Sequence, residues 1–358
     1  MKRYARELSA ALSALDQSRW RFELVQPAQR RWISRLLKHR QAERLESAVA
    51  RYGLYPLDVR GRAADLFHVL DHGYGHLVRA LDPDRTIVTC HDLMPLLSAD
   101  RRIPIRVPAN VVRTFRLRIR EMGRAWRIIT DSEATRDTLL EYTDIQASRI
   151  KVVLCGVNRI FQPREPDEVE TTRLRLGVPI EAQVVLQVAT GGRYKNTPGL
   201  LRAFARLRRK LGKRVVLIRI GAPLYEDEAD LVSSLGLTDA IQYIGTVPSD
   251  SALADWYRCA AVLAFPSLWE GFGWPPLEAM ASGTPVVASR IPAIQEVVRQ
   301  AAMLVDPEND QELALALERV LTDADEAARL RADGLARARE LTWEETAKRT
   351  LAVYEEVA

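Results

Sequence analysis

The chain alternates between short continuous apolar runs and longer stretches in which apolar residues recur at helical spacing. A short apolar run bounded by turn residues predicts a buried strand, and a three-to-four-residue repeat predicts a helix with one buried face. Strands that alternate with helices favour a parallel sheet covered by helices. The strand-like runs are, in order, DLFHVLD, TIVTCHD, RIITDSE and IKVVLCGV, then VVLQVAT, VVLIRIGAP, IQYIGTV, AVLAFPS, PVVASRIP and AMLVDP.

These runs fall into two groups, which suits a chain of 358 residues that is long enough for two domains. We expect a first domain over residues 1–163, a second over 171–340, and a last helix over 341–358. The stretch REPDEVE, between the two groups, is rich in proline and acidic residues and is predicted to be the linker. Near the start, the pattern predicts helices over 5–16 and 28–50, with a short strand, RFELVQP, between them.

The stretch from Phe265 to Ser289 combines a strand end, a glycine turn and a helix start. Two prolines after the turn suit the first turn of a helix, which Gly283 would end. A helix start offers unpaired N–H groups to a phosphate, and glycines let a bulky anion approach the backbone. Glu270 and Glu278, on either side of the turn, offer carboxylates to sugar or ribose hydroxyls. The alternative is a surface turn whose acidic residues are favoured by the helix dipole.

A second glycine turn, GGRYKN, lies between the run VVLQVAT and a helical stretch. Its cations, Arg193 and Lys195, are placed to meet a diphosphate, since both side chains bind phosphate well. The alternative is a basic turn that caps the following helix. The glycine spacing is not that of a dinucleotide-binding fingerprint, and the sequence holds no P-loop motif, so neither an NAD site nor a P-loop is supported.

Histidines gather near the ends of the first two strand-like runs. His91 follows the run TIVTC, and ligands of open parallel sheets bind beyond the carboxyl ends of strands. A histidine there can donate a hydrogen bond to a sugar hydroxyl, or it can be a structural histidine with internal partners. His68, His72 and His76 have a spacing that would suit a metal on a helix, but glycines interrupt it, so we expect a loop on the acceptor side and no metal site.

These motifs together resemble a known family. EGFGWPPLE followed by AMASGTPVV, with the turn GGRYKN and the His-Asp pair at 91–92, is similar to the donor-binding signature of the retaining glycosyltransferases of family 4. The resemblance implies an α/β protein of GT-B fold, in which two Rossmann-like domains with doubly wound parallel sheets face a cleft. It also implies that the last helix crosses back to the first domain.

The resemblance also implies an activity and a set of site residues. The activity is transfer of a hexose, of mannose or glucose type, from a GDP- or UDP-linked sugar to a glycan or lipid-linked acceptor in cell-surface polysaccharide synthesis. No metal or other cofactor is implied, since cations of the protein meet the diphosphate. The catalytic residues carried over by position are His91, Arg193, Lys195 and Glu270. The donor-binding residues are Gly271, Phe272, Gly273, Leu277 and Glu278.

One part of the family pattern is not found. N-terminal domains of such enzymes begin with a strand and a glycine-rich loop, whereas this sequence starts with a stretch, RYARELSAAL, that resembles the helix after that loop. We therefore expect the first strand of the N-terminal domain to be missing. Two alternatives to a transferase stay open: an impaired module that binds a nucleotide sugar or glycan, and a phosphorylase or sugar-nucleotide epimerase on the same fold.

Charge and composition indicate which surfaces the protein contacts and in which compartment it lies. The net charge is +5, and residues 101–127 hold nine arginines against a single acid, Glu121. This stretch and another basic stretch at 30–44 indicate a surface that binds anionic lipid or a phosphorylated acceptor. The alternative is a solvated, arginine-rich helix. Binding to nucleic acid is disfavoured, because no nucleic-acid-binding motif accompanies the charge. No apolar run reaches the ~20 residues of a membrane span, and three dispersed cysteines suit a reducing compartment. We expect a cytoplasmic protein that can associate with the inner face of the membrane.

Overall fold

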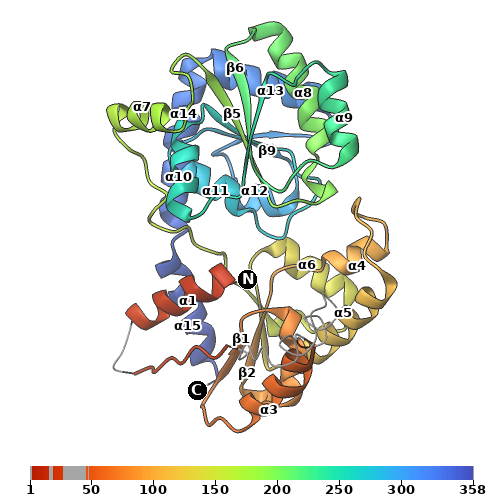
Figure 1. Cartoon of the computed structure of the whole chain (residues 1–358). Helices are drawn as coiled ribbons and strands as arrows, with labels where there is room; N and C mark the ends of the chain where they lie inside the picture. Colours follow the sequence, from red (N-terminus) through yellow and green to blue (C-terminus); the bar gives the residue numbers. More distant parts are fainter. Residues whose placement is uncertain (1, 16–18, 27–45, 47, 358) are drawn as a thin grey trace. The chain divides into compact units, whose positions relative to one another are not determined.

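The computed structural model describes residues 2–15, 19–26, 46 and 48–357 (Figure 1). They form two compact units, each built around its own sheet. The first unit comprises Met1–Ala99, Val107–Leu154 and Trp343–Ala358, and the second comprises Asp100–Arg106 and Cys155–Thr342. Every strand pair in both sheets is parallel, as the alternation of strands and helices predicts.

The sheet of the first unit has the order β1-β2-β3-β4. Its strands are β1 (Phe67–Val69), β2 (Thr86–Cys90), β3 (Arg127–Thr130) and β4 (Ile150–Val152). The α-helices are α1 (Lys2–Leu15), α3 (Tyr55–Arg60), α4 (Met94–Ala99), α5 (Ala109–Met122), α6 (Glu133–Tyr142) and α15 (Trp343–Glu355). Short helical turns are η1 (Ala50–Leu54), η2 (His72–Arg79), η3 (Pro83–Arg85) and η4 (Ala147–Arg149).

Helices cover both faces of this first sheet (Figure 1). On one face, Val88 and Ile128 of the central strands pack against apolar residues of α5 and η2. On the other face, the neighbouring position Thr89 lies beside Tyr4 of α1, which is fully buried and packs with α15. Successive residues of a strand point to opposite faces, which is why Val88 and Thr89 contact different helices.

The sheet of the second unit has the order β10-β9-β8-β5-β6-β7. Its strands are β5 (Gln183–Ala189), β6 (Val215–Gly221), β7 (Ile241–Gly245), β8 (Val262–Phe265), β9 (Val286–Ser289) and β10 (Met303–Val305). Its helices are α7 (Pro166–Arg175), η5 (Arg193–Lys195), α8 (Thr197–Leu211), α9 (Glu226–Ser234), α10 (Asp250–Cys259), α11 (Trp274–Ala281), α12 (Pro292–Val298), α13 (Asp310–Thr322) and α14 (Ala324–Glu340).

The strand order makes this second sheet doubly wound. From β5 the chain builds outward through β6 and β7, then returns to add β8, β9 and β10 on the other side of β5. The core on one face combines strand residues such as Val185 and Leu217 with apolar residues of α8 and α13. Figure 1 shows α10 and α11 on the opposite side of the sheet from α8 and α9. The expected doubly wound parallel architecture is therefore confirmed for this unit.

Each of the ten strand-like runs of the first list forms a strand, but RFELVQP does not. Residues 21–26 are described and form no strand. The rings of Trp20 and Phe22 stack on each other and pack against Tyr354 of α15, and the Val25 carbonyl accepts a hydrogen bond from Tyr55. The apolar residues of this segment thus reflect partial burial against a helix at Trp20 and Phe22, whereas Leu24 is exposed, and the described backbone joins no sheet.

Two further expectations at element level have mixed outcomes. The helix expected over 5–16 is confirmed by α1, whereas the one over 28–50 lies largely outside the described residues. The stretch REPDEVE is not simply a linker, because α7 begins within it at Pro166. A proline at the first position and two acids in the first turn, Asp167 and Glu168, are features of a helix start.

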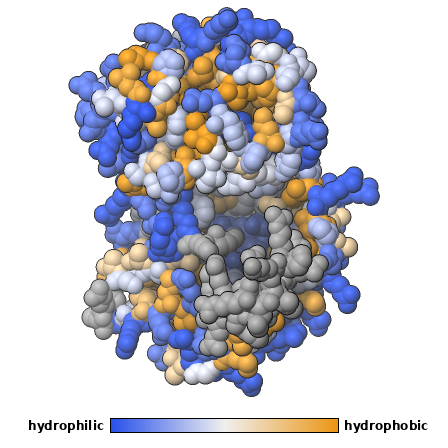
Figure 2. Space-filling model, in the orientation of Figure 1, coloured by the Kyte–Doolittle hydropathy of each residue, from blue (hydrophilic) through white to orange (hydrophobic). Residues whose placement is uncertain are grey.

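The surface shows no single dominant apolar area on the face drawn in Figure 2. Hydrophobic residues form separate patches among polar ones, which is ordinary for a water-facing surface. Within the described ranges, none of the helices is both long and apolar enough to cross a bilayer.

Candidate active site

The carboxyl ends of β5 and β8 are neighbours at the point where the strand order of the second sheet reverses. In an open parallel sheet, ligands bind at such a switch point. The loop after β5 spans residues 190–196, and the loop after β8 spans residues 266–273. The two glycine turns that the sequence singles out therefore emerge at the same place.

The loop after β5 depends on a backbone conformation that glycine adopts readily. Gly192 has φ +99°, and a Cβ at this position would lie 2.3 Å from the ring of Tyr194. Asn196 is left-handed, with φ 51°, and its side chain accepts a hydrogen bond of 3.2 Å from Gly199 N in the first turn of α8. This tight turn places Lys195, between them, in a buried position.

The loop after β8 is tied to the first loop and ends in a second glycine with positive φ. Leu268 N donates a hydrogen bond of 2.7 Å to the carbonyl oxygen of Tyr194. Gly273 has φ +114°, and a Cβ there would lie 2.5 Å from Cδ1 of Ile294. Directly after it, α11 begins at Trp274 with prolines in its first turn. The start of α11, with the positive end of its dipole, thus lies at the switch point, although its two prolines carry no N–H.

Lys195 and Glu270 form a buried ion pair across these two loops. Lys195 Nζ lies 2.6 Å from Glu270 Oε1, and the side chains are only 9% and 11% exposed. Lys195 Nζ also lies 5.1 Å from the centre of the Phe265 ring, a cation–π contact. Each charge compensates the other, so that loss of one would leave a buried charge unpaired. The ammonium can bind a phosphate, and the carboxylate can accept hydrogen bonds from hydroxyl groups.

Glu278 lies on α11 and is almost fully buried, with 2% of its surface exposed. Its Oε2 accepts a hydrogen bond of 2.9 Å from the hydroxyl of Tyr257 on α10. Sequence reasoning misses Tyr257, because a tyrosine in the helical stretch DWYRCA looks like any apolar position of an amphipathic helix. The structure identifies it as the side chain that orients the Glu278 carboxylate.

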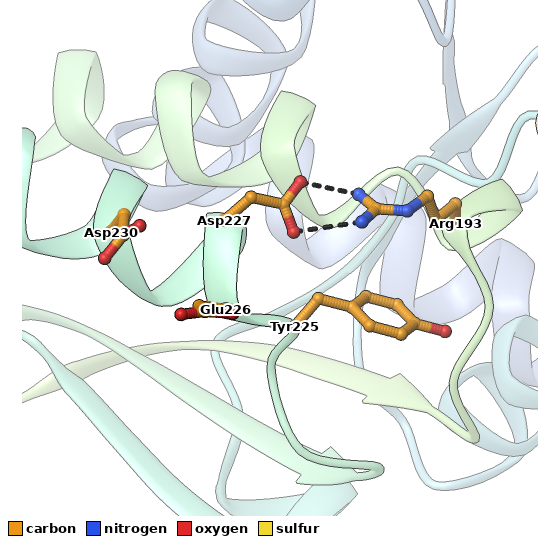
Figure 3. Close-up of a pocket in the computed structure, with 5 residues that line it drawn as sticks. All are labelled: Arg193, Tyr225, Glu226, Asp227 and Asp230. Atoms are coloured by element: carbon orange, nitrogen blue, oxygen red, sulfur yellow. Dashed lines mark hydrogen bonds and ion pairs between the residues drawn. The ribbon is translucent and has the colours of Figure 1, made fainter.

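Arg193 does not join the Lys195–Glu270 pair. Its guanidinium forms two hydrogen bonds, of 2.7 and 3.0 Å, to the carboxylate of Asp227 and lies over the ring of Tyr225 (Figure 3). The hydrogen bond and charge of Arg193 hold the pKa of Asp227 below its usual range. An open pocket lies at this contact and is lined by Arg193, Tyr225, Glu226, Asp227 and Asp230.

His91 belongs to the first unit and follows β2, as the sequence predicts. Its Nδ1 lies 3.1 Å from Oδ2 of Asp131, and its Nε2 lies 2.9 Å from the carbonyl oxygen of Leu70. Both ring nitrogens are therefore occupied. Asp131 is a second residue that sequence reasoning misses, although one signal points to it: it is a polar residue directly after a buried strand, β3, that pairs with β2.

The other three histidines expected near this sheet have separate partners. His68 contacts the hydroxyls of Tyr354 and Thr89, and His76 Nε2 contacts the carbonyl oxygen of Arg51. Rather than lying in a loop, His68 is in β1, and the other two are in η2. Across the described residues, no three His, Cys, Asp or Glu side chains gather in a way that could hold a metal ion.

Two family models match the chain, one for each half. The model of the Glycosyltransferase Family 4 matches residues 2–161, and the model of the Glycosyl transferases group 1 matches residues 168–337. The chain belongs to glycosyltransferase family 4. The two matches together cover both sheets and all of the site residues described above.

Family 4 relatives with curated names support the same assignment. A serotype-specific mannosyltransferase, WbdA, of Escherichia coli is 28% identical over 269 residues, which are 74% of this chain and 32% of that protein. A D-inositol 3-phosphate glycosyltransferase of Nocardioides sp. is 37% identical over 243 residues, covering 63% and 52%. An MMP alpha-(1->4)-mannosyltransferase of Mycolicibacterium hassiacum is 36% identical over 233 residues, covering 64% and 53%. The chain spans about a third to a half of the length of these relatives.

Solved glycosyltransferases share the fold of this family 4 chain. HepE of Anabaena, solved with UDP and glucose, aligns with a TM-score of 0.73 at 20% identity, covering 86% of this chain and 83% of HepE. WaaG, a glycosyltransferase involved in lipopolysaccharide biosynthesis, aligns with a TM-score of 0.74 at 12% identity, covering 99% and 95%. Both are GT-B proteins, which confirms the expected fold class.

The remaining residues of the family 4 signature lie in the loop after β8 and in the first turn of α11. The side chains of Phe272 and Leu277 are buried, at 6% and 0% exposure. A ligand at this turn would therefore meet these two residues, and the glycines Gly271 and Gly273, mainly through their backbone.

Proposed function

We propose that this chain transfers a glycosyl group from a nucleotide-diphosphate sugar to a hydroxyl acceptor, and that the second unit binds the donor at the end of β5 and β8. The observation that carries the proposal is the buried Lys195–Glu270 pair beside the start of α11. An ammonium, a carboxylate and the positive end of a helix dipole together match a ligand that has both phosphates and hydroxyls.

The chemistry follows from where charge develops. Departure of a nucleoside diphosphate builds negative charge on its oxygens, and Lys195 with the helix start of α11 would stabilise that charge. Glu270 would accept hydrogen bonds from the hexose, and Glu278, held by Tyr257, would accept them from the ribose. His91 would orient the sugar, and for this its Nε2–H would have to leave the carbonyl of Leu70.

Arg193 would join the donor site by exchanging partners. Its pair with Asp227 is exposed on both sides, and water screens such a pair so that it adds little to stability. A diphosphate carries more charge than one carboxylate and can replace it at little cost. Asp227 would thus hold the guanidinium in place until a donor binds.

The finer specificity that we propose is a hexose of mannose or glucose type, carried by GDP or UDP and transferred with retention to a glycan or lipid-linked acceptor. The names of the relatives support this, since two of those described above are mannosyltransferases. The HepE structure with UDP and glucose supports a uridine-linked donor as the alternative to a guanosine-linked one. The proposed setting is cell-surface polysaccharide synthesis in the cytoplasm.

A transfer assay with a panel of labelled GDP- and UDP-hexoses tests the proposal. We expect one donor to be consumed, and Lys195→Ala and Glu270→Ala to abolish transfer. Lys210→Ala is a matched control, because Lys210 forms a Lys–Glu pair of the same 2.6 Å length with Glu318, far along α8 from the site. Binding of a donor without transfer would favour the impaired binding module, and neither binding nor transfer with any donor would refute the proposal.

The exposed face of α5 fits a peripheral membrane contact. Arg113, Arg116 and Arg120 recur at helical spacing, are exposed, and have no ion-pair partner in the part of the chain that the structure describes. Leu117 lies among them and is 53% exposed. Unpaired cations around an apolar side chain match an anionic lipid surface, which attracts each basic residue by about 1 kcal/mol.

Co-sedimentation with vesicles tests this contact. We expect binding to phosphatidylglycerol vesicles, loss of that binding in the triple variant Arg113→Gln, Arg116→Gln, Arg120→Gln, and no binding to phosphatidylcholine vesicles. A control variant removes the same charge from α8 through Arg202→Gln, Arg206→Gln and Arg209→Gln. Equal loss in both variants would show that only net charge matters and would contradict a specific face.

A further inference from the structure

His91 and Asp131 are brought together by the register of two strands. Each follows a buried strand directly, and β2 and β3 are paired with Cys90 opposite Thr130. The next residue of each strand therefore lies at the same height at the carboxyl edge of the sheet. The two side chains are 6% and 7% exposed, so the contact of 3.1 Å between Nδ1 and Oδ2 is shielded from water.

His91 is held from every other side as well. Its backbone N–H donates to Nδ1 of His72 at 3.2 Å, and its carbonyl oxygen accepts from the hydroxyl of Thr135 at 3.2 Å. The ring of Tyr4 meets the imidazole edge-on, with 4.6 Å between ring centres. Such a ring has little freedom to rotate, so that the identity of its two hydrogen-bond partners is fixed.

These partners determine how many protons the pair carries. The Leu70 carbonyl oxygen can only accept, so His91 Nε2 must bear a hydrogen. A hydrogen bond between Nδ1 and Oδ2 then needs one further proton, either on the imidazole beside an ionised Asp131 or on a neutral Asp131 beside a neutral imidazole. Without that proton, a lone pair of Nδ1 would face a carboxylate oxygen. The geometry therefore requires a pair that shares one proton.

The charges around the pair favour keeping this proton. Burial lowers the pKa of His91, but the hydrogen bond and charge of Asp131 outweigh it and leave the pKa raised. Burial raises the pKa of Asp131, and this outweighs the opposing effect of His91. Both pKa values move in the same direction, as expected for two groups that titrate together.

Other titratable groups face the pair from each neighbouring element. Asp71 raises the pKa of His91 and Asp92 raises that of Asp131. Burial lowers the pKa of His72 and keeps it neutral, which agrees with its Nδ1 acting as an acceptor. His68, on β1, is partly buried, and nearby His91 helps to lower its pKa.

We propose that Asp131 is a positioning residue, which holds the His91 ring in one orientation and keeps a shared proton on the pair at neutral pH. The catalytic meaning of the inference rests on the proposed function: His91 then presents a proton-bearing Nε2 that can pass from the Leu70 carbonyl to an oxygen of the glycosyl donor. Asp131 acts through His91, which it meets with Oδ2; its other carboxylate oxygen, Oδ1, is buried without a hydrogen-bond partner among the described residues.

An NMR titration of the histidine side chains tests the proton-sharing directly. The chain has five histidines, and His91→Gln assigns the signal of His91. We expect the wild-type pair to lose its proton above pH 6.5, and Asp131→Asn to lower that midpoint by at least about one pH unit, since the burial that lowers the pKa of His91 then acts without the carboxylate. Asp71→Asn is the matched control and should change the midpoint far less. A wild-type midpoint below pH 6.5 would overturn the proposal even if no variant folds.

The pH profile of transfer separates this inference from the proposed function. In Asp131→Asn, the alkaline fall of kcat/KM should move to lower pH. Near the alkaline limit of the wild type, activity should drop about tenfold for each pH unit by which the midpoint falls. A purely structural role would lower activity equally at all pH values. If the titration behaves as expected but His91→Gln keeps full transfer, the shared proton stands and the assigned role of His91 in transfer fails.

Discussion

Lys195 and Glu270 are 75 residues apart in the chain, yet each is the ion-pair partner of the other in a nearly buried position. Neither charge is explained by stability alone, because replacing a buried ion pair by neutral residues of similar shape is often neutral or stabilising. The physical reason to keep both is that a ligand with phosphates and hydroxyls needs a cation and an acceptor at one place. Stability and binding can therefore be separated by mutation.

Breaking this pair from one side should cost more stability than removing it. Lys195→Met leaves the Glu270 carboxylate buried and unpaired, and we expect the free energy of unfolding to fall by about 1–3 kcal/mol. The double variant Lys195→Met, Glu270→Gln should recover most of this loss. Urea denaturation measures the stability, and calorimetry with nucleoside diphosphates measures binding, which both variants should lose. A double variant that binds as the wild type does would contradict the site.

The Tyr257 hydroxyl should matter through Glu278. Tyr257→Phe removes the donor of a 2.9 Å hydrogen bond to a buried carboxylate, so we expect a loss of about 1–3 kcal/mol in the free energy of unfolding and weaker donor binding. The comparison variant is Tyr243→Phe, which removes the hydrogen bond of a half-exposed tyrosine to the carbonyl of Gly221. An equal loss of donor binding in both variants would show that the effect is not specific to Glu278.

At the scale of elements, two turns position most of the candidate donor-binding residues. The loops after β5 and β8 meet because the strands are neighbours, and each needs a glycine with positive φ, Gly192 and Gly273. Sequence patterns locate both turns well, because glycine and proline mark them directly. They do not show that Arg193 and Lys195, two residues apart on a tight helical turn, reach different partners.

Gly273 should be intolerant of a side chain for two separable reasons. Gly273→Ala places a Cβ in a left-handed conformation and 2.5 Å from Cδ1 of Ile294, so we expect a loss of about 1–3 kcal/mol in the free energy of unfolding. Ile294→Val removes the clashing Cδ1 and should relieve part of that loss in the double variant. Thermal unfolding of the four proteins of this cycle measures the coupling. Simple additivity would show that the clash contributes nothing.

At the scale of the whole molecule, the first unit joins both ends of the described chain. The helices α1 and α15 pack together, and His68 of β1 contacts Tyr354 of α15 across 286 residues of sequence. Burial, followed by the electrostatic effect of nearby His91, lowers the pKa of His68 to about 3. A neutral histidine is therefore part of the packing of the C-terminal helix.

This contact predicts a loss of stability in acid. Between pH 6.5 and about 3, the unfolded chain binds a proton at His68 that the folded chain does not, so the free energy of unfolding should fall as pH falls, by at most about 1.4 kcal/mol per pH unit. Urea denaturation of the wild type and His68→Gln at pH 7, 6 and 5 isolates this contribution. The difference between them should shrink toward acid pH; a constant difference would contradict a depressed pKa.

The hydrophobic pattern was sufficient to predict the ten strands and their alternation with helices, because a strand that is buried on both faces has a continuous apolar run. Glycine, proline and charge also located both loops and the residues Lys195, Glu270 and Glu278. The pattern failed at RFELVQP, where Phe22 packs against Tyr354 of α15 and the described residues form no strand. A local hydrophobic pattern predicts that a residue packs against other residues, but it does not predict which element covers that residue.

Only the tertiary structure determined which side chains of the candidate site contact one another. Strand order brought Lys195 to Glu270, strand register brought His91 to Asp131, and packing of α10 on α11 brought Tyr257 to Glu278. Each of these contacts joins residues that are 21 to 75 positions apart, and each depends on how elements are ordered and paired in space. The sequence by itself determined which side chains lie at the ends of the strands, because a strand and the residues that follow it are adjacent in the chain. Their pairing needed the fold, because long-range contacts are set by packing.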